Sequence, residues 1–498
     1  MTLTDWLHAP DYWLSRLVIT RGLGVIYLVA FLVALNQFRP LLGERGLLPA
    51  PRFLSRVTFR QAPSLFHLRY SDRLLTAAAA LGIALSALIV VGLIDAAPLL
   101  VWMLVWFALW TLYLSIANIG QTFYAFGWES LLLEAGFLGI FLGPAGMAPP
   151  LVVIWMFRWL LFRVEFGAGL IKLRGDPCWR DLTCLYYHHE TQPMPNPLSW
   201  FFHNLPRRLH NVEVLGNHFA QLVAPIGLAF PQPVSNLAGV IIVVTQGWLV
   251  LSGNFSWLNA ITILCAVAAF DNGALSTVLP IHVPALAGPP LWYDGVLMAL
   301  TLFILVLSYQ PARNLLSRRQ MMNFSFNPYH LVNAYGAFGA ITRVRYEIVI
   351  EGTSATELDE AAVWIEYEFK GKPGNLHRLP PQVAPYHLRL DWLMWFAAMS
   401  TPADHPWFIP LLIKLLESDR PTLKLLRGNP FPHAPPTFVR ARLYRYRFTT
   451  PPEWRETRNW WARELAGDYV PPVRLARQRP SIPPGASRSG SSPGAPAG

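Results

Sequence analysis

Long apolar runs separated by short stretches with prolines, glycines and charges dominate the first 310 positions of the chain. A run of about 20 apolar residues matches a helix that crosses the roughly 30 Å hydrocarbon core of a bilayer. We therefore expect about nine membrane spans, of which the fourth and sixth are short enough to be tilted or re-entrant. The expected spans are 18–36, 75–95, 97–116, 129–142, 150–171, 217–230, 234–252, 256–271 and 293–309.

From about residue 322 the pattern changes to alternation of apolar and polar positions. RVRYEIVI (343–350), VWIEYEF (363–369) and YHLRLDW (386–392) all show a period of two, which predicts half-buried antiparallel strands. In FVRARLYRYRF the phase slips between Leu443 and Tyr444, which predicts a β-bulge.

Two further segments of this C-terminal part have helical patterns. Residues 405–427 are expected to be helical, and the Trp- and Arg-rich segment 454–466 is expected to form an amphipathic helix. Between the expected strands, KGKPGN at 370–375 has the composition of a turn.

Together these patterns predict an α-helical polytopic membrane bundle followed by a mainly antiparallel, sandwich-like β domain outside the membrane. The acidic, non-signal-like start of the chain is expected to be an interfacial helix, and the Pro-, Ser- and Gly-rich end is expected to be disordered. The expected parts are 1–17 (interfacial helix), 18–310 (bundle, with a loop at 172–216), 322–470 (β domain) and 471–498 (tail).

Composition supports a membrane protein and excludes an ordinary soluble enzyme. The chain is 53% apolar and only 14% charged. Its net charge of +11 would suggest nucleic acid in a soluble protein, but here the arginines flank apolar runs. We therefore expect contact with lipid headgroups and no nucleic-acid partner.

The expected topology relates two segments of the chain. Four spans separate residue 172 from residue 309, so the loop after the fifth span and the β domain should lie on the same side. The loop at 37–73 falls on that face and carries seven arginines, whereas 272–292 has no Lys or Arg. The positive-inside rule would place this face in the cytoplasm.

The fifth expected span contains charges at a spacing of seven. Arg158, Glu165 and Lys172 therefore drift by only about 20° per step and share one helix face. One interpretation is structural: Arg158 pairs with Glu165, and Lys172 extends to the interface. The other is catalytic, because Lys172 is the only lysine before residue 370 in a chain whose basic residues are mostly arginine. A desolvated lysine beside Arg158 can serve as a general base or nucleophile.

The fourth expected span carries two carboxylates, Glu129 and Glu134. Paired carboxylates can perform acid–base work or bind a metal. The favoured interpretation is that they pair with Arg158 and Arg163 across the helix interface, since charges inside a bundle usually pair.

The segment CWRDLTCLYYHHETQPMPNPLSW (178–200) contains two of the three cysteines. Cys178 and Cys184 are separated by five residues, which is not the spacing of common zinc sites. The histidines that follow, His188, His189, His203, His210 and His218, leave Cys/His ligation as a minor alternative, but their spacing matches no strong metal motif, so we expect no metal and no cofactor. The pair can close a loop as a disulfide in an oxidising compartment, or stay reduced and redox-active in the cytoplasm. The third, Cys265, is expected to pack as a small apolar residue.

Downstream, Pro193, Pro195, Pro197 and Pro206 stand among aromatic residues. Such a rigid segment suits a recognition surface, and it equally suits an interfacial cap over the bundle.

The segment GLIKLRGDPCWRDLTCLYYHHETQPMPNPLSWFFHNLP closely resembles the signature region of the lipase maturation factors. NHFAQLVAPIGLAF, QGWLVLSGNFSWLNAITI, YAFGWESLLLEAGF and NPYHLVNAYGAFGAITRVRYEIVIEGT resemble the same family, and the resemblance covers about residues 10–470. It implies a polytopic protein of the endoplasmic reticulum membrane that acts as a chaperone-like factor, rather than an enzyme, in the folding and assembly of secreted dimeric lipases.

The resemblance also implies particular roles for residues. Cys178 and Cys184 fall on the family's cysteine pair, with links to lumenal redox balance, and the β domain falls on its client-binding region. The family places that region in the lumen, equivalent to the periplasmic face of the inner membrane for a bacterial member. The resemblance does not fix the client or the oligomeric state. We expect the loop to bind a client protein through Trp179, Arg180, Asp181, His188, His189, Glu190, Gln192, Pro193, Pro195 and Asn196.

A shorter stretch, GAGLIKLRGDPCW, is similar to membrane proteins of the vitamin K-dependent carboxylase type. In that comparison Lys172 falls on the lysine that abstracts a proton from the reduced quinone. This similarity implies the alternative function, a membrane enzyme acting on a quinone or a lipid.

Overall fold

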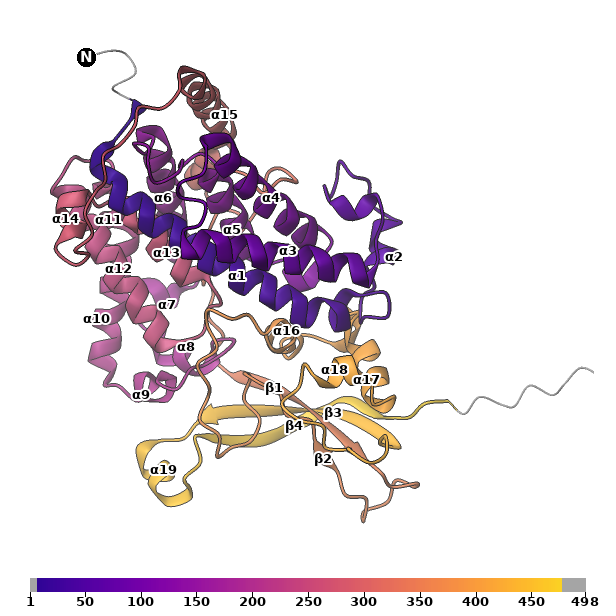
Figure 1. Ribbon diagram of the computed structural model, residues 1–498. Helices are drawn as coiled ribbons and strands as arrows, with labels where there is room; N and C mark the ends of the chain where they lie inside the picture. Colours follow the sequence, from indigo (N-terminus) through magenta and orange to yellow (C-terminus); the bar gives the residue numbers. More distant parts are fainter. Residues whose placement is uncertain (1–6, 477–498) are drawn as a thin grey trace, which may run out of the picture.

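The computed structural model describes residues 7–476 and places a bundle of helices above a small β-sheet (Figure 1). A short 3₁₀ turn at Pro10–Tyr12 precedes the first long helix. The helices of the bundle are α1 (Trp13–Leu42), α2 (Ala50–Leu54), α3 (Asp72–Val91), α4 (Leu99–Asn118), α5 (Gly127–Gly139), α6 (Leu151–Arg174), α7 (Pro177–Arg180), α8 (Leu185–Thr191), α9 (Ser199–His203), α10 (Arg207–His218), α11 (Ala224–Gly227), α12 (Val234–Ser252), α13 (Leu258–Val267), α14 (Asn272–Ser276) and α15 (Leu291–Leu316).

Every expected span falls on a helix or a series of helices, but the number nine is not confirmed. Within residues 7–476, five helices are long and apolar enough to cross a membrane: α1 with its preceding turn, α3, α4, α12 and α15. The expected span at 217–230 is a chain of short pieces, the end of α10, a π-helical turn at Phe219–Val223 and α11.

Close helix packing in the bundle depends on small residues. A Cβ added to Gly82 of α3 would lie 2.5 Å from the ring of Phe31 on α1. One added to Gly24 of α1 would lie 2.9 Å from Ile89. Glycine lets these two backbones approach closely, as is common between membrane helices. The outer helix α15 instead exposes Leu302, Leu305 and other apolar side chains, as expected of a surface that contacts lipid.

The C-terminal part contains one antiparallel sheet of four strands in the order β2-β1-β3-β4. The slip at Leu443 and Tyr444 is confirmed as an irregularity in the pairing of β3 with β4. The strands are β1 (Arg345–Thr353), β2 (Ile365–Glu366), β3 (Phe438–Phe448) and β4 (Trp461–Val473), and the helices are α16 (Arg389–Ala397), α17 (Phe408–Leu416), α18 (Arg420–Leu423) and α19 (Pro451–Thr457).

This architecture corrects the sandwich-like prediction. Among the described residues there is a single sheet, and its second layer consists of α16, α17 and α18, which lie between α1 and the strands (Figure 1). The expected alternation in β1 is also altered, because the segment 190–193 covers the face that was expected to be polar. Arg345 and Glu347, expected on a polar face, are buried, whereas Tyr346 is 38% exposed.

Two further secondary-structure predictions were wrong. YHLRLDW is not a strand, because the helix α16 begins at Arg389. Its buried Leu390, Leu393, Met394 and Ala397 also fit helical spacing, and a short run cannot distinguish the two periods. The amphipathic helix expected at 454–466 ends as α19 at Thr457, because Arg458 adopts a left-handed conformation (φ 58°) before β4 begins.

Both ends of the described chain also differ from expectation. Residues 13–17 belong to α1 and do not form a separate interfacial helix. The expected start of the disordered tail, residue 471, is too early, because β4 continues to Val473. Residues 1–6 and 477–498 lie outside the described residues.

Candidate functional site

The loop after α6 is closed by a disulfide between Cys178 and Cys184. Asp176 caps the short helix α7 by accepting a hydrogen bond from the amide of Cys178 at 3.0 Å. The amide of Thr183 donates to the carbonyl of Cys178 at 2.8 Å, and Leu182 adopts a left-handed conformation (φ 58°). Both cysteines are buried, so the bridge forms part of a packed turn.

This turn is held against the segment that leads into the sheet. Arg343 donates to Asp176 at 2.7 Å, and the indole of Trp179 donates to the carbonyl of Phe338 at 2.7 Å. Burial acts to raise the pKa of Asp176, but hydrogen bonds from Arg343 and from backbone amides outweigh it and hold the pKa below its usual range.

The continuation of the loop lies between the bundle and the sheet. Arg345 of β1 donates to the backbone carbonyls of Glu190, Gln192 and Pro193. The Glu190 carboxylate accepts from the amide of Phe448 in β3 at 2.7 Å. These contacts place the loop next to the C-terminal domain, in agreement with the expectation that both lie on the same side of the membrane.

The residues expected to bind a client differ in their exposure to solvent, and most of them are buried. Arg180 and Asp181 are exposed, and Glu190 is partly buried. The amide of Gln192 donates inward to the carbonyl of Ser252 at 2.9 Å. Seven of these side chains are buried: Trp179, His188, His189, Gln192, Pro193, Pro195 and Asn196.

Two of the carboxylates inside the bundle form ion pairs, although not always with the expected partners. Arg163 on α6 forms an ion pair with Glu134 on α5, in agreement with the favoured interpretation. Glu129 pairs instead with Arg389 on α16, at 2.8 Å. Arg158 pairs with neither Glu165 nor Glu129, because its guanidinium donates to the carbonyls of Ala268, Leu228 and Ala269 and to the hydroxyl of Tyr12.

Lys172 lies near the end of α6, and its side chain is buried in a polar cluster. Its ammonium donates to Asn217 at 2.7 Å and to Gln221 at 2.9 Å, and lies 4.6 Å from the ring centroid of Trp179. Nearby, Glu165 accepts from Gln246 at 2.6 Å. Gln221 belongs to the π-helical turn, a feature that often marks functional sites.

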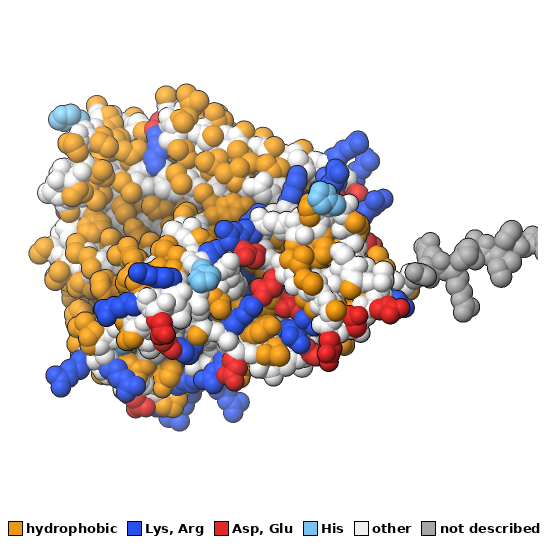
Figure 2. All heavy atoms as spheres, turned by 90° about the horizontal axis from the view of Figure 1, so that it is seen from below, with side chains coloured by type: hydrophobic (Ala, Val, Ile, Leu, Met, Phe, Trp, Pro, Cys, Tyr) orange, Lys and Arg blue, Asp and Glu red, His pale blue; other side chains and the backbone are white. Residues whose placement is uncertain are grey.

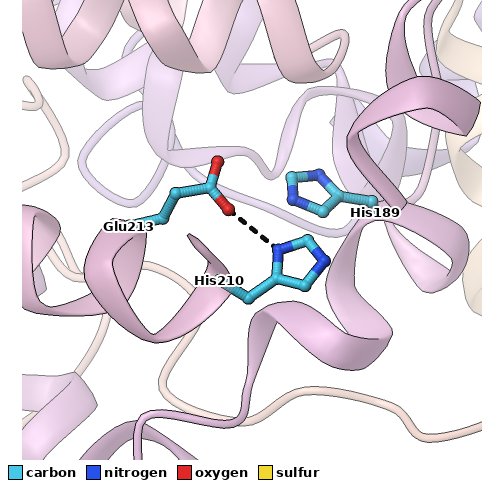
Figure 3. A group of neighbouring side chains, drawn as sticks. All are labelled: His189, His210 and Glu213. Carbon is cyan, nitrogen blue, oxygen red and sulfur yellow. Dashed lines mark hydrogen bonds and ion pairs between the residues drawn. The ribbon is translucent and has the colours of Figure 1, made fainter. Parts of the chain in front are cut away.

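Two histidines and a glutamate meet between α8 and α10. His189 on α8 faces His210 and Glu213 on α10 (Figure 3). Burial lowers the pKa of His189, and the neighbouring histidines lower it further. The sequence offered His189 and His210 as possible ligands, but their spacing matched no metal motif. Glu213 was not considered, although it lies three residues from His210 and so shares its helix face.

On the sheet, an exposed row of side chains crosses three strands. Tyr346, Arg445 and Glu464 lie directly opposite one another in the register of β1, β3 and β4. Residues paired in this way share one face of a sheet. All three are exposed, and Figure 2 shows acidic and basic side chains intermixed over the C-terminal part. The period-two pattern assigned residues 343–350 and 438–448 to strands, but it does not contain the register in which the strands pair.

Comparison with known proteins gives matches over both parts of the chain. The model described as the lipase maturation factor transmembrane domain matches residues 14–277, and the lipase maturation factor C-terminal domain matches residues 331–471. The chain belongs to the lipase maturation factor family.

Individual relatives match over almost their full length. Lipase maturation factor 1 of Mus musculus is 42% identical over 515 residues, which cover 94% of this chain and 88% of the relative. The protein of the same name from Homo sapiens is 41% identical, covering 95% and 90%. Lipase maturation factor 2 of Homo sapiens is 28% identical, covering 93% and 83%. No solved structure matches.

Membership of the lipase maturation factor family agrees with the apolar helices of the bundle. The matched transmembrane domain contains four of the five candidate spans, and the matched C-terminal domain contains the sheet. The protein is therefore an integral membrane protein in which a helical bundle precedes a small antiparallel sheet.

Proposed function

We propose that this protein is a membrane-bound maturation factor that assists the folding and assembly of a secreted, lipase-like client. The observation that carries the proposal is the 42% identity to lipase maturation factor 1 of Mus musculus, which extends over both domains. Similarity restricted to the bundle would support only a shared membrane scaffold. Similarity over the sheet as well supports a shared working surface.

The proposed client surface is the exposed row Tyr346, Arg445 and Glu464, together with Arg180 and Asp181 of the disulfide loop. An aromatic ring beside charges of both signs suits binding to a polypeptide, since Tyr and Arg are enriched in interface hot spots. The buried side chains of the loop position this surface by joining the sheet to the bundle. In this proposal, residues 18–310 anchor the protein and residues 322–473 engage the client.

The proposed location of this surface is an oxidising compartment. The disulfide between Cys178 and Cys184 supports that side, because such bonds persist in the lumen of the endoplasmic reticulum or the bacterial periplasm. The arginines of the 37–73 loop favour the opposite orientation under the positive-inside rule. We give the disulfide more weight, since a stable structural bridge requires oxidising conditions whereas the charge rule has exceptions.

Complementation tests the proposal directly. The protein is expressed in cells that lack their own lipase maturation factor 1, together with a secreted dimeric lipase, and lipase activity in the medium is measured. We expect secreted activity to be restored, and to fall several-fold in an Arg445→Glu variant. Arg455→Glu, a reversal at an exposed arginine on α19 outside the sheet, is the matched control. Full restoration by a chain lacking residues 322–473 would overturn the proposed surface.

One observation favours a second candidate function. Lys172, Glu165 and the amides of Gln221, Gln246 and Asn217 form a buried polar cluster, and an ionisable residue at such a depth is a functional-site candidate. The candidate reaction is proton abstraction from a quinone or lipid by Lys172. Product formation from a reduced quinone by the purified protein, lost in Lys172→Arg, would support this enzyme over the maturation factor.

A further inference from the structure

The group formed by His189, His210 and Glu213 has the geometry of a ligand set. One ligand atom from each residue lies within 4.8 Å of the other two. The Nδ1 atom of His210 and the Oε2 atom of Glu213 are 2.8 Å apart, and the ring of His189 faces both (Figure 3). The three side chains come from two helices, α8 and α10, and the segment that joins these helices contains the short helix α9.

Two of these side chains lack the hydrogen bonds that burial normally demands. His189 is 3% exposed and His210 is 2% exposed. Among residues 7–476, neither ring nitrogen of His189 has a hydrogen-bond partner, and neither does Nε2 of His210. Burial of an unpartnered polar group is unfavourable, and most buried polar atoms in folded proteins are paired. A metal ion would supply the missing partner for an imidazole nitrogen.

The surroundings of Glu213 resemble the outer shell of a metal site. Its second oxygen, Oε1, accepts a hydrogen bond from the indole of Trp248 on α12 at 2.9 Å. A donor of this kind fixes the orientation of a coordinating carboxylate and tunes its affinity. Trp248 is 46% exposed, so this residue can be changed without opening the core.

We propose that His189, His210 and Glu213 bind a divalent transition metal ion of the zinc class. Two imidazoles and one carboxylate form an established zinc donor set, which leaves a fourth position for another ligand. Hard cations such as Mg²⁺ prefer oxygen ligands and fit this set poorly. The bound ion fixes α8 to α10 and so stabilises the connection between the bundle and the sheet.

This role is consistent with the other face of α10. Leu209, Val212 and Leu215 on that helix are exposed and form an apolar stripe at a spacing of three. Such a stripe suits a helix that lies at the membrane interface. A metal bridge from this helix to α8 therefore ties the loop to the membrane surface.

The test uses the full chain purified in detergent. Metal content is measured by elemental analysis, and the thermal midpoint is followed as Zn²⁺ or Mg²⁺ is added back to chelator-treated protein. A ligand that binds only the folded state raises this midpoint in proportion to its affinity. Co²⁺ substitution provides an absorption spectrum that reports the coordination geometry. The variants are His189→Gln, His210→Gln and Trp248→Phe, and the control is His218→Gln, another histidine on α10.

We expect about one equivalent of zinc in the wild type and in His218→Gln, and a rise of the midpoint with Zn²⁺ but not with Mg²⁺. His189→Gln and His210→Gln should lose the metal. Trp248→Phe should retain the fold and bind zinc about 10-fold more weakly, which keeps the test valid if the histidine variants fail to fold. Equal zinc content and equal midpoint shifts in wild type, His189→Gln and Trp248→Phe would overturn the proposal, as would a wild-type chain that does not respond to Zn²⁺.

Discussion

Glu129 on α5 and Arg389 on α16 form a buried ion pair at 2.8 Å that joins positions 260 residues apart in the sequence. The carboxylate also accepts a hydrogen bond from the hydroxyl of Tyr113 on α4. The guanidinium lies 3.3 Å from the ring centroid of Tyr124. This pair therefore fixes the C-terminal domain to the bundle.

Removal of one partner should weaken the attachment of the two domains. Arg389→Met leaves Glu129 buried without its counter-charge, which typically costs about 3–5 kcal/mol. We expect a lower thermal midpoint and faster proteolysis between the bundle and the sheet. Arg427→Ala is the matched control, because its ion pair with Glu368 is half exposed and should contribute no more than about 1 kcal/mol. Equal midpoints for the two variants would contradict a joining role for Glu129 and Arg389.

Reduction of the disulfide should destabilise the loop. Loss of a short covalent loop typically costs about 2 kcal/mol. The wild-type midpoint should therefore fall when a reductant is added, whereas Cys178→Ser should show the lower midpoint under both conditions. Cys265→Ser controls for removal of a cysteine elsewhere, since Cys265 is a buried free thiol. A membrane-impermeant thiol reagent that labels the pair only after reduction would also establish its side.

Stability should fall as the pH drops from about 6.5 to about 4 because two buried histidines are neutral in the folded state. Burial and the adjacent Arg389 together lower the pKa of His387 to about 4, although Glu129 opposes this change. Burial likewise lowers the pKa of His330 to about 4, although the charge of Glu129 opposes this change. The unfolded chain binds these protons at its ordinary pKa near 6.5, so between the two values it holds more protons than the folded chain.

The measurement is the free energy of unfolding across this pH range. Each histidine should contribute a slope of up to about 1.4 kcal/mol per pH unit, with stability greatest above pH 6.5. His330→Asn can still hydrogen-bond with Ser130 or Asn118. It should remove the contribution of His330 to the slope of the free energy of unfolding against pH. A slope unchanged from that of the wild type would exclude His330 as a source.

Substitutions of Lys172 separate the two candidate functions. If the protein acts as a maturation factor, Lys172→Ala should lower stability by about 1–3 kcal/mol, because Asn217 and Gln221 lose their buried donor, yet leave secreted lipase activity per folded molecule unchanged. If Lys172 is a base, Lys172→Arg should abolish activity although the charge is kept. Activity should be normalised to the amount of folded protein.

Much of this molecule follows from local pattern alone. The apolar runs located the helices of the bundle, because a helix in lipid must be apolar along its length. The phase slip at Leu443 and Tyr444 located a bulge, because side chains alternate strictly along a strand. The Cys178 and Cys184 segment identified the family, since both its residues and their order are unusual. These features depend on neighbours in the sequence.

The remaining features depend on residues brought together by folding. Three contacts join segments that lie far apart in the sequence, so local spacing does not predict them. They are the pairing of Glu129 with Arg389, the burial of Arg345 beneath the loop and the approach of His189 to His210. The helix α16 replaced an expected strand because packing against α1 and β1 decided between two periods that the segment satisfied equally. Local pattern therefore determined which segments are helices or strands in most of the chain, whereas tertiary packing determined which charges are paired and which loop residues are buried. The physical reason is that desolvation and ion pairing act through space, between positions whose separation along the chain carries no information about their contact.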